Sequence, residues 1–482
     1  MLFNSLDFAV FLPLVFFLHW FVAKKSLKAQ NILIVIASYI FYGRWDWRFL
    51  FLLLFSTLTD FFTGLGLLNE QNIQKRKFLL ALSIFVNLTF LMVFKYYNFF
   101  IDSFISAFTF FGKPINFRHI NIVLPVGISF YTFQTMSYSI DVYKKKLEPT
   151  KNFIAFAAFV AFFPQLVAGP IERAAKLLPQ FYIKRVFNYE KASDGCKQIL
   201  WGFFKKMVIA DNCAVYVNMV FDHYKNYSGS TLLLGAVLFA FQIYGDFSGY
   251  SDIAIGTSKL FGVTLMKNFA FPYFSRDMAE FWRRWHISLT TWFRDYVYIP
   301  LGGSKRDTLI SIRNTFIIFL VSGFWHGANW TFIAWGFINA LYFLPLMLLK
   351  RNRQNKDTAA AGKTFPGFKE LVSIISTFFL TVIGWIFFRS YTIRDSAGYL
   401  AKIFSKTIFK KPAFNIVSKY SIVGALISII ILISIEWINR DEEYGLKKLP
   451  KSKLLRWVII IGITMVIVEL GGAQQEFIYF QF

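Results

Sequence analysis

The stretch NTFIIFLVSGFWHGANWTFIAWGFINALYFLPLMLL, residues 314–349, indicates the fold class of this 482-residue chain. It contains no Asp, Glu, Lys or Arg, and it is long enough to cross a bilayer twice. His326 and Gly327 lie near the junction of the two passes. Because a bilayer offers backbone groups no water to bond with, segments of this kind are helices.

The rest of the chain has the same character. Hydrophobic residues make up 56% of it and charged residues 16%, and the charges gather between long apolar runs. A soluble chain of ordinary composition has about 25% charged residues. We therefore predict an all-α polytopic membrane protein with about 11 spans plus re-entrant segments. The candidate spans amount to twelve passes, close to that number, at residues 8–23, 31–43, 49–68, 78–100, 121–143, 197–221, 231–252, 314–349 (two passes), 371–388, 421–438 and 455–470.

Basic residues between the spans predict the orientation of the chain. The net charge is +25, and in a membrane protein such an excess marks cytoplasmic loops rather than a nucleic-acid partner. Lys24, Lys25 and Lys28 follow the first span without a small-residue cleavage site. That span is therefore expected to be an anchor with the N-terminus outside, and alternation of the spans leaves the C-terminus outside as well.

Two segments depart from simple alternation. Both ends of residues 152–168 are expected on the cytoplasmic side, so we predict a re-entrant segment that is buried in protein. The loop 389–420 is expected outside, yet it is basic. Its basic residues are Arg389, Arg394, Lys402, Lys406, Lys410, Lys411 and Lys419. Charge bias is a statistical rule, so one exception leaves the predicted orientation standing.

The cysteines and histidines do not predict a metal site. Cys196 and Cys213 lie on one predicted helix, about 25 Å apart at about 1.5 Å rise per residue, which is far beyond disulfide reach. The five histidines show no metal-ligand spacing with them. His19, His119 and His223 are interpreted as packed or interfacial residues, because no catalytic grouping surrounds them.

His326 is the strongest candidate for chemistry. Apolar and aromatic residues flank it for a full span on either side. An ionisable side chain at membrane depth suggests a function, and burial keeps imidazole a neutral base that can take a proton from a hydroxyl. The alternative is a histidine that hydrogen-bonds neighbouring helices together.

His286 lies in a basic, aromatic segment, FWRRWHISLTTWFRDYVYIPLGG. Helical spacing places six of its residues on one face of a helix: Phe281, Trp285, Ser288, Leu289, Trp292 and Tyr296. Arg283, Arg284 and Arg294 lie off that face. Two interpretations stay open for them: snorkelling on an interfacial helix, or cations of a cytoplasmic pocket that bind the phosphates of a donor.

Polar residues inside predicted spans add further candidates. Asp246 and Asp252 are intramembrane carboxylates, and Asn329 follows His326 closely. Each could line a polar path, although helix-packing contacts explain the aspartates equally well. The stretch GDFSGYSD does not match the G-x-S-x-G pattern of serine hydrolases, because Ser248 follows Asp246 and Phe247.

Several stretches together resemble the membrane-bound O-acyltransferase family, in particular its bacterial branch of alginate O-acetyltransferase membrane subunits. They are LPVGISFYTFQTMSYSIDVY (124–143), FFPQLVAGPIER (162–173), YGDFSGYSDIAIG (244–256), FPYFSRDMAEFWRRWHISLTTWFRDYVYIPLGG (271–303), GFWHGANWTFIAWG (323–336) and FIYFQF (477–482). Each is weak alone, but they occur in the family's order over nearly the whole chain. The resemblance is therefore specific.

The resemblance implies a single integral-membrane domain over residues 1–482, with a catalytic core at about 121–349, in which tilted helices surround a transmembrane tunnel. It implies that His326 is catalytic and that His286 is a second active-site histidine toward the cytoplasmic entrance. No resident cofactor is expected. Acetyl-CoA would be the donor substrate and a polysaccharide outside the membrane the acceptor. A periplasmic SGNH-type acetyltransferase would be a partner, and the site of action would be a bacterial inner membrane.

Two alternatives remain at this point. A related activity moves D-alanine from a carrier protein to a cell-wall polymer. A polytopic transporter of glycans or lipids, without chemistry, is the alternative from another class, although no internal repeat supports an inverted-repeat transporter.

Overall fold

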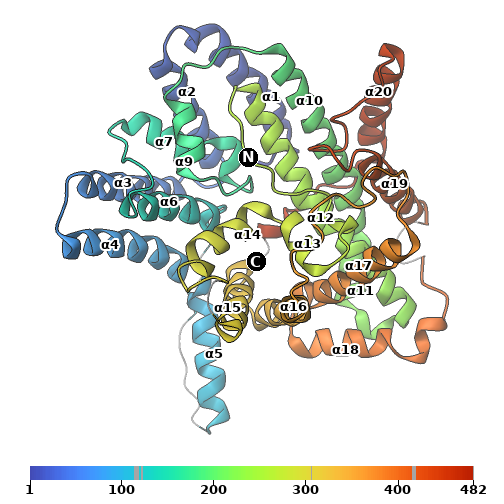
Figure 1. Ribbon diagram of the computed structural model, residues 1–482. Coiled ribbons are helices and arrows are strands. Elements are labelled where there is room, and N and C mark those ends of the chain that lie inside the picture. The colour runs from blue at the N-terminus through green and yellow to red at the C-terminus, as the bar shows by residue number, and fades with distance from the viewer. Residues whose placement is uncertain (113–118, 121–122, 305–306, 415–418, 481–482) are drawn as a thin grey trace. The chain divides into compact units, whose positions relative to one another are not determined.

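The computed structural model describes residues 1–112, 119–120, 123–304, 307–414 and 419–480. Within these ranges all regular secondary structure is helical (Figure 1), which confirms the all-α class. The chain forms two compact units, one of residues 1–192 with 257–265 and one of residues 193–256 with 266–482. The single domain expected over residues 1–482 stays a prediction.

The first unit holds the N-terminal helices. They are α1 (Leu6–Phe17), α2 (Leu27–Gly43), α3 (Phe49–Leu68), α4 (Ile73–Leu91), α5 (Tyr97–Phe110), α6 (Ile128–Tyr143), α7 (Phe153–Ala161), α8 (Phe163–Leu166) and α9 (Ala174–Leu177). Helix α3 begins and ends where the span 49–68 was predicted. Helix α6 covers most of the span predicted at 121–143, whose first two residues lie outside the described ranges.

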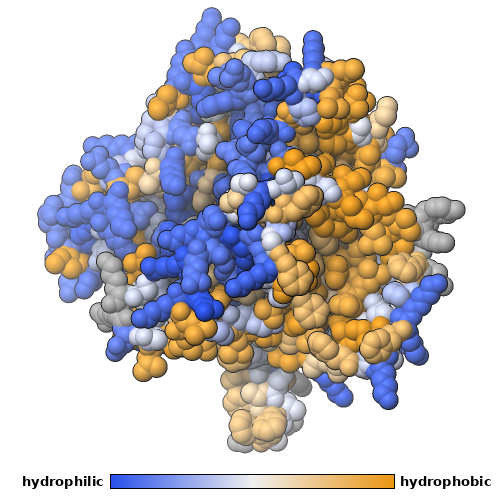
Figure 2. Space-filling model, turned by 45° about the vertical axis from the view of Figure 1, so that its right-hand side comes forward, coloured by the Kyte–Doolittle hydropathy of each residue, from blue (hydrophilic) through white to orange (hydrophobic). Residues whose placement is uncertain are grey.

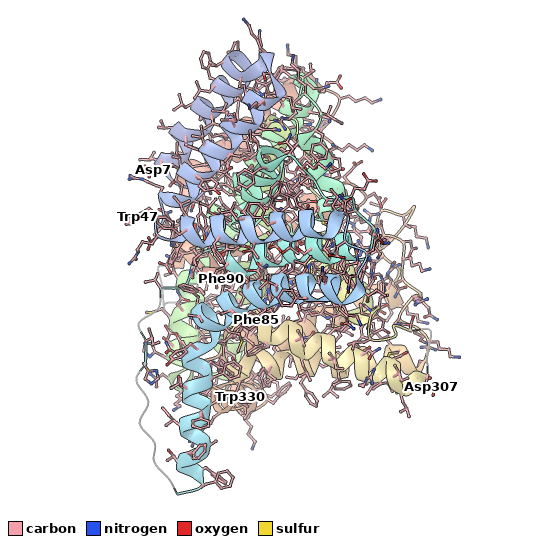
Figure 3. The ribbon with its side chains drawn as sticks, turned by 90° about the vertical axis from the view of Figure 1, so that its left-hand side faces the viewer. Asp7, Trp47, Phe85, Phe90, Asp307 and Trp330 are labelled. Carbon is pink, nitrogen blue, oxygen red and sulfur yellow. The ribbon has the colours of Figure 1, made fainter. Side chains whose placement is uncertain are left out.

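The span predicted at 78–100 is not one straight helix. Helix α4 ends at Leu91, a π-helical turn covers Met92–Tyr96, and α5 then runs in a different direction (Figure 3). Figure 3 marks Phe85 and Phe90 on α4 ahead of this bend. A π-turn interrupts the regular ladder of backbone hydrogen bonds, and this is a known cause of sharp kinks. Apolar content alone did not show it.

The segment expected to be re-entrant forms two short helices, α7 and α8. All side chains from residue 155 to residue 172 are buried. Non-helical backbone at membrane depth is tolerated when protein surrounds it, so this burial meets the main physical requirement of a re-entrant segment. Its depth in a membrane stays a prediction.

The second unit holds the remaining helices. They are α10 (Tyr189–Phe203), which begins in the first unit, α11 (Asp211–Asp222), α12 (Gly229–Leu260), which ends in the first unit, α13 (Met278–Arg284), α14 (Ile287–Phe293), α15 (Thr308–His326), α16 (Trp330–Leu348), α17 (Phe368–Arg389), α18 (Ile393–Ile403), α19 (Lys419–Ile438) and α20 (Lys453–Leu470). A π-helical segment, Phe204–Ala210, joins α10 to α11.

Helix α12 lies in the core, and residues 238–258 are all buried. Two glycines of YGDFSGYSDIAIG let α12 approach the α10–α11 segment closely. A Cβ on Gly249 would lie 2.8 Å from the carbonyl oxygen of Gly202, and one on Gly256 would lie 2.5 Å from that of Gly195. Small residues spaced along one helix face allow this backbone approach in membrane proteins.

By length and hydropathy, seven helical segments in the described part of the chain could cross a membrane. Two apolar helices are shorter, Leu27–Gly43 and Ile422–Ile438. These helices support a chain with several membrane spans, while the count of about 11 spans stays a prediction. Figure 2 shows a broad apolar surface, and large apolar side chains of α19 and α20 such as Ile430 and Met465 are exposed, as expected of helices that face lipid.

Candidate functional site

His326 is the last residue of α15, at the turn of a tight helical hairpin with α16. Figure 3 marks the two ends of α15 by Asp307, which precedes it, and Trp330, which starts α16. The side chain of His326 is 3% exposed. Gly327 turns the chain, and a Cβ there would lie 2.1 Å from the ring of Phe332. Glycine after the histidine is therefore required by packing.

His286 lies at a break between α13 and α14. The sequence predicted one continuous amphipathic helix here, and that prediction is wrong. The loop at residues 268–270 takes over backbone hydrogen bonds at the break: Ala270 N donates to Arg284 O (3.0 Å) and Ile287 N to Asn268 O (2.9 Å). Because these partners satisfy the peptide groups, the helix can stop. His286 adopts φ 43° and ψ 53°, an uncommon conformation for a residue other than glycine.

The break turns His286 toward His326. Their ring centroids are 6.3 Å apart, with 52° between the planes. His286 is 1% exposed, and burial lowers the pKa of its imidazole to about 3. The ring is therefore neutral at physiological pH, because burial disfavours the charged form. The structure brings together the two histidines that the sequence singled out.

Aromatic rings enclose the two histidines. The T-shaped contacts are closest, at 4.6 Å between the centroids of His286 and Phe247 and 5.0 Å between those of His326 and Trp325. The rings that contact one or both imidazoles belong to Phe247, Trp325, Trp335, Phe388 and Tyr479. Together with the two histidines they form the histidine cluster. Such a lining excludes water and preserves an uncharged base.

Tyr479 reaches this cluster because the C-terminal segment turns inward (Figure 1). Its ring lies 5.6 Å from that of His326 and 4.5 Å from that of Phe247. The segment is held at two backbone positions: Ile478 N donates to Asp246 Oδ2 (2.6 Å), and Gln475 O accepts from Lys206 Nζ (3.1 Å). Nothing in the local pattern of FIYFQF predicts that Tyr479 lies at the site. Residues 481–482 of that motif lie outside the described ranges.

The two intramembrane aspartates are bound in ion pairs. Asp246 Oδ1 lies 2.6 Å from Lys206 Nζ, which also lies 2.9 Å from Asp211 Oδ1. Asp252 Oδ2 lies 2.6 Å from Lys205 Nζ. These five residues form the ion-pair layer, and all are buried. The structure gives both aspartates helix-packing contacts, and a role in a polar path stays a prediction. Adjacent lysines inside a predicted span were a visible signal that the sequence analysis missed.

The three arginines differ in their surroundings. Arg283 donates to the carbonyl oxygens of Asn352 and Asn355 (2.8 and 2.5 Å), in the linker after α16. Arg284 pairs with Glu280 (2.9 Å). Arg294 is more open, with 59% of its side chain exposed, and pairs with the neighbouring Asp295. Arg283 and Arg284 thus fasten the linker and α13, and donor binding by any of the three stays a prediction.

The α15–α16 hairpin separates two sets of contacts. At its open end, the linker after α16 contacts Arg283. At its turn, Asn329 caps α16 by accepting from Thr331 N (3.0 Å) and donates to Tyr391 O (3.0 Å). Tyr391 in turn donates to Asp222, at the end of α11. Helix α13 and the linker after α16, both expected on the cytoplasmic side, therefore contact each other. The hairpin turn, Tyr391 and the end of α11, all expected outside, also contact one another.

The other histidines and the cysteines have different surroundings. His19 packs against Trp20 and Phe261 in the first unit, and His119 is exposed. Both cysteines are unpaired. Among the described residues, no three His, Cys, Asp or Glu side chains gather closely enough to hold a metal ion.

Residues 144–387 match the sequence model of the MBOAT, membrane-bound O-acyltransferase family. This region contains both histidines of the cluster and all three arginines. The chain is 40% identical over 409 residues to the probable alginate O-acetylase AlgI of Pseudomonas putida, which covers 84% of this chain and 80% of that protein.

Two further similar proteins act on other polymers, by their names. The peptidoglycan O-acetyltransferase of Helicobacter pylori is 34% identical over 430 residues, which is 83% of this chain and 79% of that protein. The teichoic acid D-alanyltransferase of Streptococcus thermophilus is 31% identical over 291 residues, which is 55% of this chain and 68% of that protein. The three names share acyl transfer.

Proposed function

The chain belongs to the membrane-bound O-acyltransferase family, and on that premise we propose that it passes an acetyl group from cytoplasmic acetyl-CoA across the membrane for O-acetylation of an extracytoplasmic polysaccharide. The names of its relatives support a polymer acceptor, because alginate and peptidoglycan both carry sugar hydroxyls. The observation that carries the proposal is the buried pair His286 and His326, whose ring centroids lie 6.3 Å apart inside aromatic walls.

The proposed reaction uses His326 as the base. An acceptor hydroxyl gives its proton to a ring nitrogen of His326 while its oxygen attacks the thioester carbonyl. The new C–O ester bond forms as the C–S bond breaks, and the imidazolium proton passes to the leaving CoA thiolate. General-base catalysis of this kind contributes about 10²–10⁴-fold in rate. Aromatic walls support it by keeping water from hydrolysing the thioester.

The donor is proposed to enter beside α13 and α14. Arg283, Arg284 and Arg294 offer cations there for the phosphates of CoA, and His286 follows the first two directly in the chain. The acceptor side is proposed at the hairpin turn, beyond His326. Both termini would then lie outside a bacterial inner membrane, and a periplasmic SGNH-type acetyltransferase would be a partner on that side.

Thiol labelling tests this direction. Single cysteines would be placed by Asn226→Cys, Lys356→Cys and Lys305→Cys in a chain without Cys196 and Cys213; position 305 lies outside the described residues. On intact cells, a membrane-impermeant reagent should label position 226 and leave 356 and 305 protected. Labelling of 356 from outside would reverse the proposed direction.

A second candidate is D-alanyl transfer from a carrier protein, favoured by the identity to the teichoic acid D-alanyltransferase. Purified protein in lipid nanodiscs would be given radiolabelled acetyl-CoA or D-alanyl carrier, with polysaccharide fragments as acceptor. We expect an alkali-labile acetyl ester and no D-alanyl ester. A D-alanyl ester alone would favour the second candidate. Glycan movement across vesicles without any ester would favour the transporter.

A further inference from the structure

A polar cavity of about 270 Å³ lies in the second unit, outside the histidine cluster. It is lined by the loop that ends α11, the end of α17 and the start of α18. The residues that define it are Asp222, Tyr224, Arg389, Tyr391, Asp395 and Tyr399. None of them takes part in the reaction proposed above, so the cavity needs its own explanation.

Aromatic rings and charged groups alternate around this cavity. Tyr391 donates its hydroxyl to Asp222 Oδ1 (3.1 Å), and Tyr224 donates to Asp395 Oδ1 (3.3 Å). The guanidinium of Arg389 lies 3.5 Å from Asp222 Oδ1. Flat apolar faces beside oriented carboxylates suit a ligand that has C–H faces and hydroxyl edges, which is the chemistry of a sugar ring.

The cavity is connected to the catalytic histidine by two short contacts. Asn329, three residues after His326, donates to the backbone oxygen of Tyr391 (3.0 Å). Phe388, the residue before Arg389, packs its ring 5.4 Å from that of His326. A ligand held here would lie at the turn of the α15–α16 hairpin, on the side proposed for the acceptor.

The surrounding segment is basic. Residues 389–411 contain six basic residues and a single acidic one, Asp395. Arg394, Lys406, Lys410 and Lys411 are exposed. The charge rule expects few Lys and Arg in this loop if it lies outside. A cationic surface around a binding site attracts an anionic ligand, which would explain the exception.

We propose that this cavity is an acceptor subsite that takes one sugar ring of a carboxylate-bearing polysaccharide, with the rest of the acidic chain lying over the basic segment. The inference rests on the proposed function, since it names the acceptor of that reaction. It assigns Tyr391, which is 61% exposed, as the ring that stacks on the sugar, and Lys225 as a rim cation.

Binding of defined oligosaccharides tests the proposal. The protein in nanodiscs would be titrated calorimetrically with a hexameric oligouronate and with cellohexaose, a neutral chain of equal length. We expect the oligouronate to bind at least tenfold more tightly at low salt, with the difference shrinking as salt screens the charges. Tyr391→Ala should weaken oligouronate binding about tenfold, which is about 1.4 kcal/mol.

Two controls keep the test specific. Phe409→Ala removes an exposed aromatic ring from the same segment outside the cavity, and binding should not change. Lys225→Gln, at an exposed position, should weaken oligouronate binding but not cellohexaose binding. This variant replaces Tyr391→Ala as the test if Tyr391→Ala fails to fold.

Acetyl-CoA binding and turnover would be followed in the same samples, so that failure of the subsite and failure of the proposed function are distinguishable. Oligouronate binding weakened in Tyr391→Ala, with wild-type affinity for acetyl-CoA, supports the subsite. Equal binding of both oligosaccharides overturns it. The subsite is also overturned if wild-type protein binds neither oligosaccharide but binds a periplasmic protein through Tyr391. Wild-type protein without acyl transfer from acetyl-CoA contradicts the proposed function instead.

Discussion

The ion-pair layer and the histidine cluster are both buried, and each includes one of two neighbouring residues of α12. These residues are Asp246 in the ion-pair layer and Phe247 in the histidine cluster. In the ion-pair layer each charge has an opposite charge at short range, as in Lys205 with Asp252 at 2.6 Å. In the histidine cluster the imidazoles contact aromatic rings instead. Burial alone therefore does not distinguish a structural group from a reactive one. Paired charges stabilise helix packing, whereas a neutral base among rings can react.

The largest effect is expected from His326→Ala, which removes the base. Turnover of acetyl-CoA should fall about 10²–10⁴-fold while the protein still folds. His19→Ala is a matched control, because His19 is also buried against aromatic rings but belongs to the first unit. Steady-state rates of both purified variants would be compared. If the two variants lose activity equally, the histidine cluster has no special role.

Breaking the ion-pair layer should affect stability first. Lys205→Met leaves Asp252 buried without its cation, and removal of one partner from a buried pair costs about 3–5 kcal/mol. Thermal unfolding in detergent should shift down, and Lys205→Met/Asp252→Asn should recover part of the loss. If the folded double variant is inactive, Asp252 belongs to the path of the acyl group, and the contrast between the two regions fails.

Gly327→Ala should disturb the histidine cluster through packing alone. The added Cβ would meet the Phe332 ring at 2.1 Å, and overpacking of this kind costs about 1–3 kcal/mol. The turn that carries His326 should shift, so activity should fall more than stability. Gly462→Ala in α20 is the control, because open space surrounds that position. Wild-type turnover in Gly327→Ala would show that the position of His326 is uncritical.

The smallest effect is expected at Arg294. Its side chain is mostly exposed, so Arg294→Gln should leave the fold intact and weaken acetyl-CoA binding about tenfold through loss of a phosphate contact. Arg456→Gln removes an exposed cation from α20 and should not change binding. Equilibrium binding of labelled acetyl-CoA would separate the two. Identical affinity in both variants would assign Arg294 to the interface with lipid head groups.

Local apolar patterns predicted most of the helices. The span 49–68 coincides with α3, and the junction predicted near His326 is the turn between α15 and α16. These features depend on residues close together in the chain, such as Gly327 and Asn329. Hydropathy and small turn residues are sufficient evidence for them.

The features that the sequence did not predict depend on contacts between residues that are far apart in the chain. The helix break at His286 depends on the loop at residues 268–270, and the position of Tyr479 depends on Asp246, which is far away in the chain. Periodicity within one segment carries no information about such partners. The adjacent lysines at 205 and 206 were readable as intramembrane charges, but their partners were not.

Oriented proteoliposomes test the central claim most directly, namely that an acyl group passes through the histidine cluster from one side of the membrane to the other. Thiol labelling at positions 226 and 356 would define the orientation of the protein. Radiolabelled acetyl-CoA would be supplied on the side of position 356, and an oligosaccharide acceptor trapped on the side of position 226. Acetyl ester should form on the trapped acceptor with wild-type protein and should not form with His326→Ala. Ester formation only when donor and acceptor share a side, or equal transfer by His326→Ala, would contradict the central claim.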